Sequence, residues 1–80
     1  MDMTTAKIER LLKEIRPESD FAASSDFIAG GLLDSFDVVA LVAALDEAFS
    51  ISIDGTDVTP ENFRNLEAIL RLLGKNGAQL

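Results

Sequence analysis

The sequence predicts an all-α fold in a single domain of residues 1–80, with three principal helices and one short helix around one core and a long first connection. Apolar side chains recur at helical spacing in three separate segments, which is typical of helices with one buried face. Residues that favour helix starts and stops stand at the edges of these segments. A strand-like alternation at residues 50–53 has no second β-rich segment to pair with, so we expect an extended loop there.

The first helix is expected over about residues 4–16, with apolar and charged side chains on opposite faces. Thr4 or Thr5 suits its start, and Pro17 ends it because the residue before a proline is disfavoured in the α conformation. Residues 17–34 then lack helical periodicity apart from a short turn near residues 25–29. We expect apolar side chains to anchor this long connection across the helices. These anchors are Phe21, Phe27, Ile28, Leu32 and Leu33.

The second helix is predicted over residues 35–49, beginning at Asp34 or Ser35, and it is apolar on two faces. The face expected in the core carries Val38, Leu41, Val42, Leu45 and Phe49. The other face carries Phe36, Val39, Ala40 and Ala43, edged by Asp37, Asp46 and Glu47. A helix that is apolar on two sides is either fully buried or keeps one face for a partner. The acidic residues at both ends of the second patch favour a partner.

The last third of the chain predicts a turn and two more helices. Residues 54–57 are expected to form the turn, and Thr59 followed by Pro60 indicates a short helix over about residues 59–63. Asn65 is expected to cap a final helix over residues 65–73. Gly74 is expected to end that helix, and residues 74–80 to form a tail.

Composition excludes several classes of function. The chain has neither cysteine nor histidine, which removes disulfides, thiolate metal sites and the usual zinc and acid–base sites. We therefore expect a protein that is not an enzyme, with no catalytic residue and no bound metal. No apolar segment approaches the roughly 20 residues that span a membrane, so no membrane insertion is expected. The first residues lack the layout of a secretion signal, which predicts a cytoplasmic location.

Charge is distributed unevenly along the chain. The net charge is −7, and the segment between Pro17 and Phe63 holds ten acidic residues and no lysine or arginine. Such a segment repels nucleic acid and would steer the protein toward basic partner surfaces. An acidic face that only keeps a small protein soluble is the other interpretation that charge alone allows.

A motif at the start of the second helix indicates a more specific function. The run is Gly31-Leu32-Leu33-Asp34-Ser35-Phe36-Asp37-Val38-Val39. Alone, Asp34-Ser35 before an apolar helix is usually only a helix cap. Together with residues 41–49, 51–53, 58–63 and 66–69, however, the motif resembles the acyl carrier protein family over most of the chain. The resemblance implies an acyl-carrier-like four-helix bundle.

In that family the serine of an Asp-Ser motif receives 4′-phosphopantetheine. The resemblance therefore implies covalent attachment at Ser35, with Asp34 as the flanking residue. A phosphopantetheinyl transferase would supply the arm from coenzyme A, and its thiol would hold cargo as a thioester. A phosphodiester there would lie at a helix N-terminus, which favours anions. Gly30 and Gly31 would let the chain turn tightly before the site.

The resemblance also implies partner enzymes that dock on the second helix of a monomeric carrier. The expected classes of partner enzyme are a phosphopantetheinyl transferase and an acyl- or aminoacyl-adenylating ligase, a ketosynthase or an acyltransferase. The docking residues would be Phe36, Asp37, Val39, Ala43, Asp46 and Glu47. Phe36 replaces the family's usual leucine, and Ala40 and Ala43 replace an acidic and a larger apolar residue of fatty-acid carriers. Fatty acyl, polyketide and amino acid cargo all stay open, the last because Leu-Leu-Asp-Ser also resembles D-alanyl carriers.

Three other functions can be weighed from the residues. An EF-hand beginning at Asp54 fails, because its fifth position is Val58 and its twelfth is Asn65 instead of glutamate. An enzyme with Ser35 as nucleophile would need a base such as histidine, which the chain lacks. A non-catalytic acidic helical adaptor without a prosthetic group, binding through the patch around Phe36, stays open as the alternative.

Overall fold

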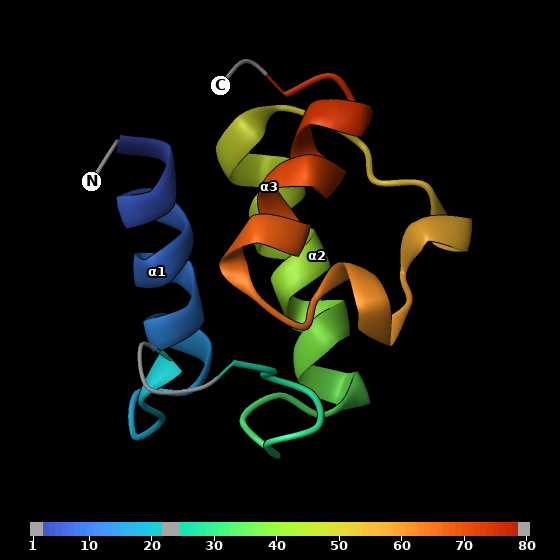
Figure 1. The fold of residues 1–80 in the computed structure, drawn as a ribbon. Coiled ribbons are helices and arrows are strands. Elements are labelled where there is room, and N and C mark those ends of the chain that lie inside the picture. The colour runs from blue at the N-terminus through green and yellow to red at the C-terminus, as the bar shows by residue number, and fades with distance from the viewer. Residues whose placement is uncertain (1–2, 22–24, 79–80) are drawn as a thin grey trace.

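Figure 1 shows a computed structural model of the protein, in which residues 3–21 and 25–78 are described. The principal helices are α1 (Met3–Ile15), α2 (Ser35–Phe49) and α3 (Leu66–Lys75), and two short 3₁₀ helices, η2 (Gly55–Asp57) and η3 (Pro60–Asn62), precede α3. No strand occurs among the described residues. The predicted all-α class is therefore confirmed. Within the same residues no helix is long and apolar enough to cross a membrane.

The three principal helices surround one apolar core. Helix α1 runs in the opposite direction to α2, so the C-terminal end of α1 and the N-terminal end of α2 lie at the same end of the molecule (Figure 1). The buried side chains include Ile8 and Leu12 from α1, Val38, Leu41 and Leu45 from α2, and Ile69, Leu72 and Leu73 from α3. Phe63, between η3 and α3, is also completely buried. Val38, Leu41 and Leu45 confirm the buried stripe predicted for α2, while Val42 and Phe49 are half-buried against the core.

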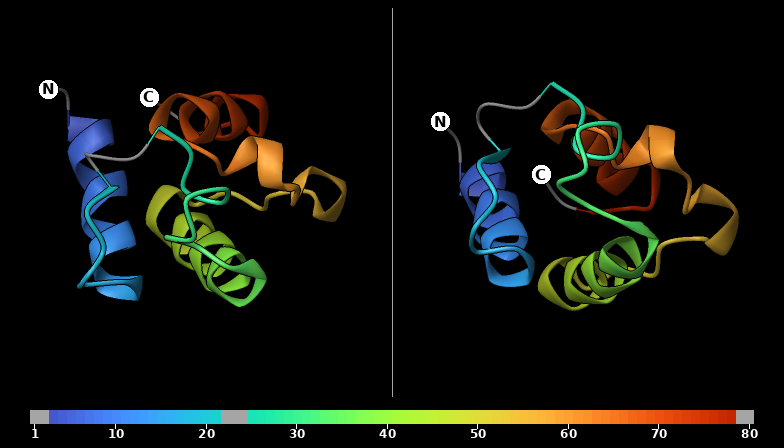
Figure 2. Two further views of the ribbon diagram at one scale, coloured as in Figure 1. Left: turned by 60° about the horizontal axis from the view of Figure 1, so that its bottom comes forward. Right: turned by 90° about the horizontal axis from the view of Figure 1, so that it is seen from below.

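The long connection between α1 and α2 is held by its aromatic side chains. Phe21 and Phe27 are 6% and 1% exposed, and their rings pack edge to face with centroids 5.0 Å apart. The N–H of Phe27 donates to the carbonyl of Arg64 before α3, and its own carbonyl accepts the N–H groups of Leu32 and Leu33. Figure 2 shows this connection crossing the end of the bundle between α2 and α3. The expected anchoring of the connection is confirmed.

The bounds of α1, α3 and the short helix differ from the sequence prediction by one or two residues. Helix α3 passes through Gly74 and ends at Lys75, and Gly77 takes the left-handed conformation with φ of 88°. The N–H groups of Gly77 and Ala78 donate to the carbonyls of Gly74 and Leu73, which is a Schellman motif. Gly74 was the wrong glycine, because the helix continues two residues beyond the predicted end and Gly77 then lets Ala78 pack against the core. The short helix η3 is also shorter than expected. In the turn before it, the Oδ1 of Asp54 accepts hydrogen bonds from the N–H and the hydroxyl of Thr56.

Truncating one of two phenylalanines tests how the connection is anchored. Phe27→Ala removes a completely packed ring and is expected to lower the free energy of unfolding by about 3–5 kcal/mol. Phe36→Ala makes the same change at a ring that is 81% exposed, and it should stay within about 0.5 kcal/mol of the wild type. Urea unfolding of both variants measures the difference. Equal losses in the two variants would contradict the packing described for the connection.

Candidate functional site: the start of helix α2

Two aspartates form a reciprocal cap at the start of α2. The Oδ1 of Asp34 accepts the N–H of Asp37 at 2.8 Å, and the Oδ2 of Asp37 accepts the N–H of Asp34 at 3.1 Å. This capping box satisfies two of the N–H groups that a helix N-terminus leaves without intrahelical partners. Asp34 is therefore the N-cap, and Ser35 is the first residue of the helix.

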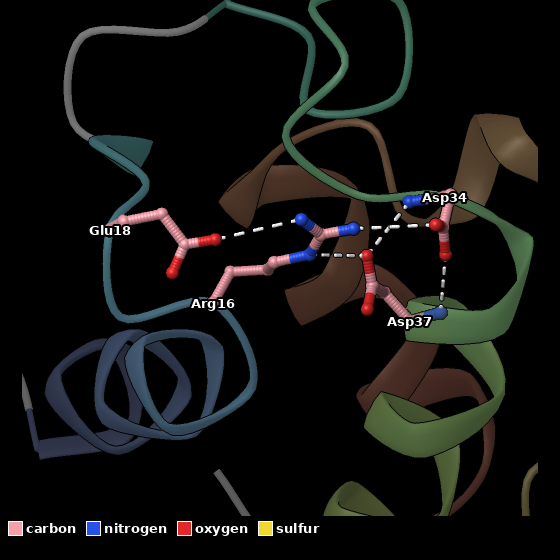
Figure 3. A network of polar contacts seen from close by, with 4 residues as sticks. All are labelled: Arg16, Glu18, Asp34 and Asp37. Carbon is pink, nitrogen blue, oxygen red and sulfur yellow. Dashed lines mark hydrogen bonds and ion pairs between the residues drawn. The ribbon is translucent and has the colours of Figure 1, made fainter.

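Arg16 links this cap to the end of α1 (Figure 3). Its Nε donates to the Oδ2 of Asp37 at 2.7 Å, and its Nη2 lies 3.3 Å from the Oδ2 of Asp34. A longer contact of 3.6 Å joins its Nη1 to the Oε1 of Glu18. The guanidinium thus contacts both carboxylates of the capping box, although 21 positions separate Arg16 from Asp37 in the chain.

The contacts around Asp37 favour its charged form. The hydrogen bond from the N–H of Asp34 is the main cause that lowers the pKa of Asp37, and the hydrogen bond and charge of Arg16 lower it further against the opposing effect of burial. The hydrogen bond to Asp37 likewise raises the pKa of Arg16. Asp37 is the only buried charged side chain among the described residues, and this pairing explains how its burial is tolerated.

Ser35 is exposed and stands between the two aspartates of the cap. The capping box uses the N–H groups of Asp34 and Asp37, and no described residue accepts those of Ser35 and Phe36. Gly31 precedes the site with φ of 77°, a conformation that side chains with a Cβ rarely adopt, whereas Gly30 does not have a positive φ. A Cβ at Gly31 would meet no atom within 4 Å, so the backbone conformation explains the glycine there.

The outer face of α2 leaves an apolar patch in solvent. Phe36 and Val39 are 81% and 65% exposed, and Ala40, Ala43 and Glu47 are exposed beside them. Helix α2 is therefore apolar on two faces because one face lies in the core and the other is exposed to solvent. We call Phe36, Val39, Ala40 and Ala43 the outer patch.

Comparison with known proteins identifies the family of the chain. A family model described as phosphopantetheine attachment site matches residues 5–73, which is most of the chain. The chain belongs to that family of carrier proteins. Its prosthetic group is 4′-phosphopantetheine, and it acts as a carrier and not as an enzyme. No curated protein and no solved structure matches the chain.

Two of the acids expected to meet partners of this carrier are engaged internally. Asp37 is buried because it caps α2 and pairs with Arg16, so its carboxylate is engaged within the protein. Asp46 is half-buried, and its Oδ1 accepts the N–H of Ile53 at 2.9 Å, which holds the extended loop after α2. Glu47, the third acidic residue at the edge of the patch, is exposed, and no described residue pairs with it.

Sequence reasoning missed the contact of Arg16 with the start of α2. The available signal was an aspartate three positions after Asp34, the spacing of a capping box, together with the last basic residue before the acidic segment. The carrier also offers no group of three metal-ligating side chains within residues 3–21 and 25–78. The other predicted site residues lie together on α2. Asp34 and Ser35 are at its N-terminal end, and its exposed face carries Phe36, Val39, Ala43 and Glu47.

Acid titration tests the role of the Asp37 carboxylate. Because its pKa in the folded state lies below the unfolded value of about 3.9, its charge stabilises the fold above that pH, and this contribution is lost as the pH falls through the folded pKa. Asp37→Asn keeps an oxygen acceptor without charge. The wild type should exceed this variant in free energy of unfolding at pH 7, and the difference should narrow below about pH 4. Urea unfolding from pH 7 to pH 3 measures it, and a difference independent of pH would refute the assignment.

Proposed function

We propose that Ser35 carries the phosphopantetheine arm and that the carrier passes acyl or aminoacyl groups, held as thioesters, between partner enzymes. The observation that supports this most directly is the exposed hydroxyl of Ser35 at the first position of α2, inside the region that matches the family. No other described serine or threonine begins one of the three principal helices. Attachment requires a hydroxyl, and Ser35 offers one in an accessible place.

The surroundings of Ser35 suit a phosphodiester. The unused N–H groups of Ser35 and Phe36 and the positive end of the α2 dipole favour an anion at this end of the helix. Asp34 and Asp37 oppose a further negative charge, but Arg16 contacts both carboxylates and offsets their charge. The residues present therefore fit the prosthetic group, which supplies the thiol that this chain lacks.

The attachment step leaves one role to the modifying enzyme. A bond forms between Ser35 Oγ and phosphorus, the bond from that phosphorus to the adenosine 3′,5′-bisphosphate part of coenzyme A breaks, and the hydroxyl proton must be accepted. The chain has no histidine or cysteine, and the carboxylates of Asp34 and Asp37 are both held in capping and ion-pair contacts. The transferase therefore has to supply the base. What this chain contributes is the position of the hydroxyl.

We propose the outer patch and Glu47 as the surface on which partner enzymes dock. Phe36, next to Ser35, offers a large apolar ring, and the alanines make the middle of the patch flat. This surface suits a transferase and then enzymes that load or use the thioester, such as an adenylating ligase, a ketosynthase or an acyltransferase. The alanine-rich patch argues against carriage in primary fatty acid synthesis, while acyl, polyketide and aminoacyl cargo remain consistent with it.

Arm loading tests the proposed attachment site. The purified protein is incubated with coenzyme A and a broad-specificity phosphopantetheinyl transferase, and its intact mass is measured. We expect one added phosphopantetheine on the wild type and none on Ser35→Ala, with Ser25→Ala, a change at another exposed serine, loaded as the wild type is. Absence of any addition to the folded wild type would refute the carrier function and favour the adaptor without a prosthetic group.

Kinetics of the same reaction test the docking surface. Phe36→Ala is expected to raise the KM for the carrier about tenfold, the loss typical of a buried aromatic contact at an interface. Met3→Ala removes an equally exposed apolar side chain from α1 and should leave KM unchanged.

A charge reversal tests steering separately. Glu47→Lys should slow loading more at low salt than at high salt, because opposite charges steer encounter and salt screens them. Glu14→Lys reverses an exposed charge on α1 and serves as the control. Equal effects of the two reversals would show that only net charge matters.

A further inference from the structure

The long connection between α1 and α2 has its two ends joined by one side chain. Arg16 follows directly on α1, and its N–H still donates to the carbonyl of Leu12, so its backbone continues the helix. Pro17 comes next. From this fixed position the guanidinium reaches the capping aspartates of α2 at 2.7 and 3.3 Å. The start of α2 is therefore tied to the end of α1 at the residues that flank Ser35.

The tie depends on the shape of the arginine as well as on its charge. Nε contacts Asp37 and Nη2 contacts Asp34, so two separate N–H groups of a planar guanidinium serve two carboxylates at once. A lysine ammonium carries the same charge but presents a single nitrogen. No other basic residue occurs between Lys13 and Arg64 in the sequence, and Lys13 donates to the carbonyl of Ser19.

We propose that Arg16 is a positioning residue for the modification of Ser35. It holds the capping box closed, which keeps the first turn of α2 formed and the Ser35 hydroxyl in one place when the transferase acts. This inference rests on the proposed attachment at Ser35 and assigns to Arg16 no contact with the reacting atoms. Its side chain is 33% exposed. It points toward the two carboxylates of the cap, as Figure 3 shows.

A positioning role has its own kinetic signature. Loss of Arg16 loosens the hydroxyl in the bound complex, so the rate at saturating transferase falls. It also leaves the Asp34 and Asp37 charges uncompensated, which makes this end of the carrier more acidic, so binding to a basic partner surface does not weaken. A docking contact would do the reverse, raising the half-saturating concentration with little change in the saturating rate.

The experiment measures single-turnover loading of the full chain with excess transferase and coenzyme A. The variants are Arg16→Gln and Arg16→Lys, and Arg10→Gln removes an exposed arginine about 9 Å earlier along α1 as the matched control. All are assayed at a temperature where circular dichroism shows each variant folded. Amide hydrogen exchange of Asp37 and Val38, whose N–H groups both donate to Asp34, reports directly on the first turn of α2.

For Arg16→Gln we expect the saturating rate to fall about tenfold, well within the ~100-fold that a misplacement of about 1 Å can cause. The half-saturating concentration should not rise, and exchange of the first-turn amides should become faster. Arg16→Lys should lie between this variant and the wild type, and Arg10→Gln should equal the wild type. If Arg16→Gln does not fold, the same comparison is made with Arg16→Lys.

Two results would overturn the proposal. One is an unchanged saturating rate in a folded Arg16 variant, which would limit Arg16 to stability. The other is an effect confined to the half-saturating concentration, which would make Arg16 a docking contact. A wild type that accepts no arm at all would instead refute attachment at Ser35, so failures of the two proposals are distinguishable.

Discussion

The carboxylate of Asp37 joins two parts of the molecule that the chain itself connects only through a long excursion. One oxygen accepts both the N–H of Asp34 and the guanidinium of Arg16, so the same group caps α2 and fixes it to the end of α1. Closing a connection of this length costs conformational entropy that local contacts must offset. The buried rings of Phe21 and Phe27 hold its middle, and the ion pair holds its ends. Ser35, the proposed attachment residue, lies where this connection ends at the start of α2.

This arrangement separates three requirements of a carrier on a single helix. The inner face of α2 supplies Leu41 and Leu45 to the core, so the helix is rigidly placed. Its N-terminal end is fixed by hydrogen bonds that leave Ser35 exposed. Its outer face, beginning at Phe36, makes no contribution to the core and is open to solvent. A flexible arm attached at Ser35 would thus be anchored to a rigid helix end. Successive partners would then meet the same attachment geometry.

Much of this could be predicted from the sequence, because helix periodicity and capping residues are local signals. The span of α2, its buried stripe and the anchoring phenylalanines all follow from spacing and residue type. What failed needed knowledge of distant neighbours. In the sequence, Asp37 is simply an acidic residue at the edge of an apolar patch. Only its contact with Arg16, 21 positions away, makes it a buried counter-ion. The end of α3 failed for a related reason, since Gly74 and Gly77 both suit a helix stop and packing of Ala78 decides between them.

The internal use of acidic side chains changes how docking should be understood. Asp37 and Asp46 belong to the acidic segment, yet one caps a helix and the other holds the loop at Ile53. Their charges still contribute to the long-range field that steers encounter, but they are poorly placed to form direct ion pairs with a partner. In the proposed docking mode, direct recognition then falls to the four residues of the outer patch and to Glu47. A small apolar contact with few direct charge pairs suits complexes that must form and separate at each transfer. Strong binding would retain the cargo with one enzyme, so a flat alanine-centred patch is consistent with a carrier that serves several partners in turn.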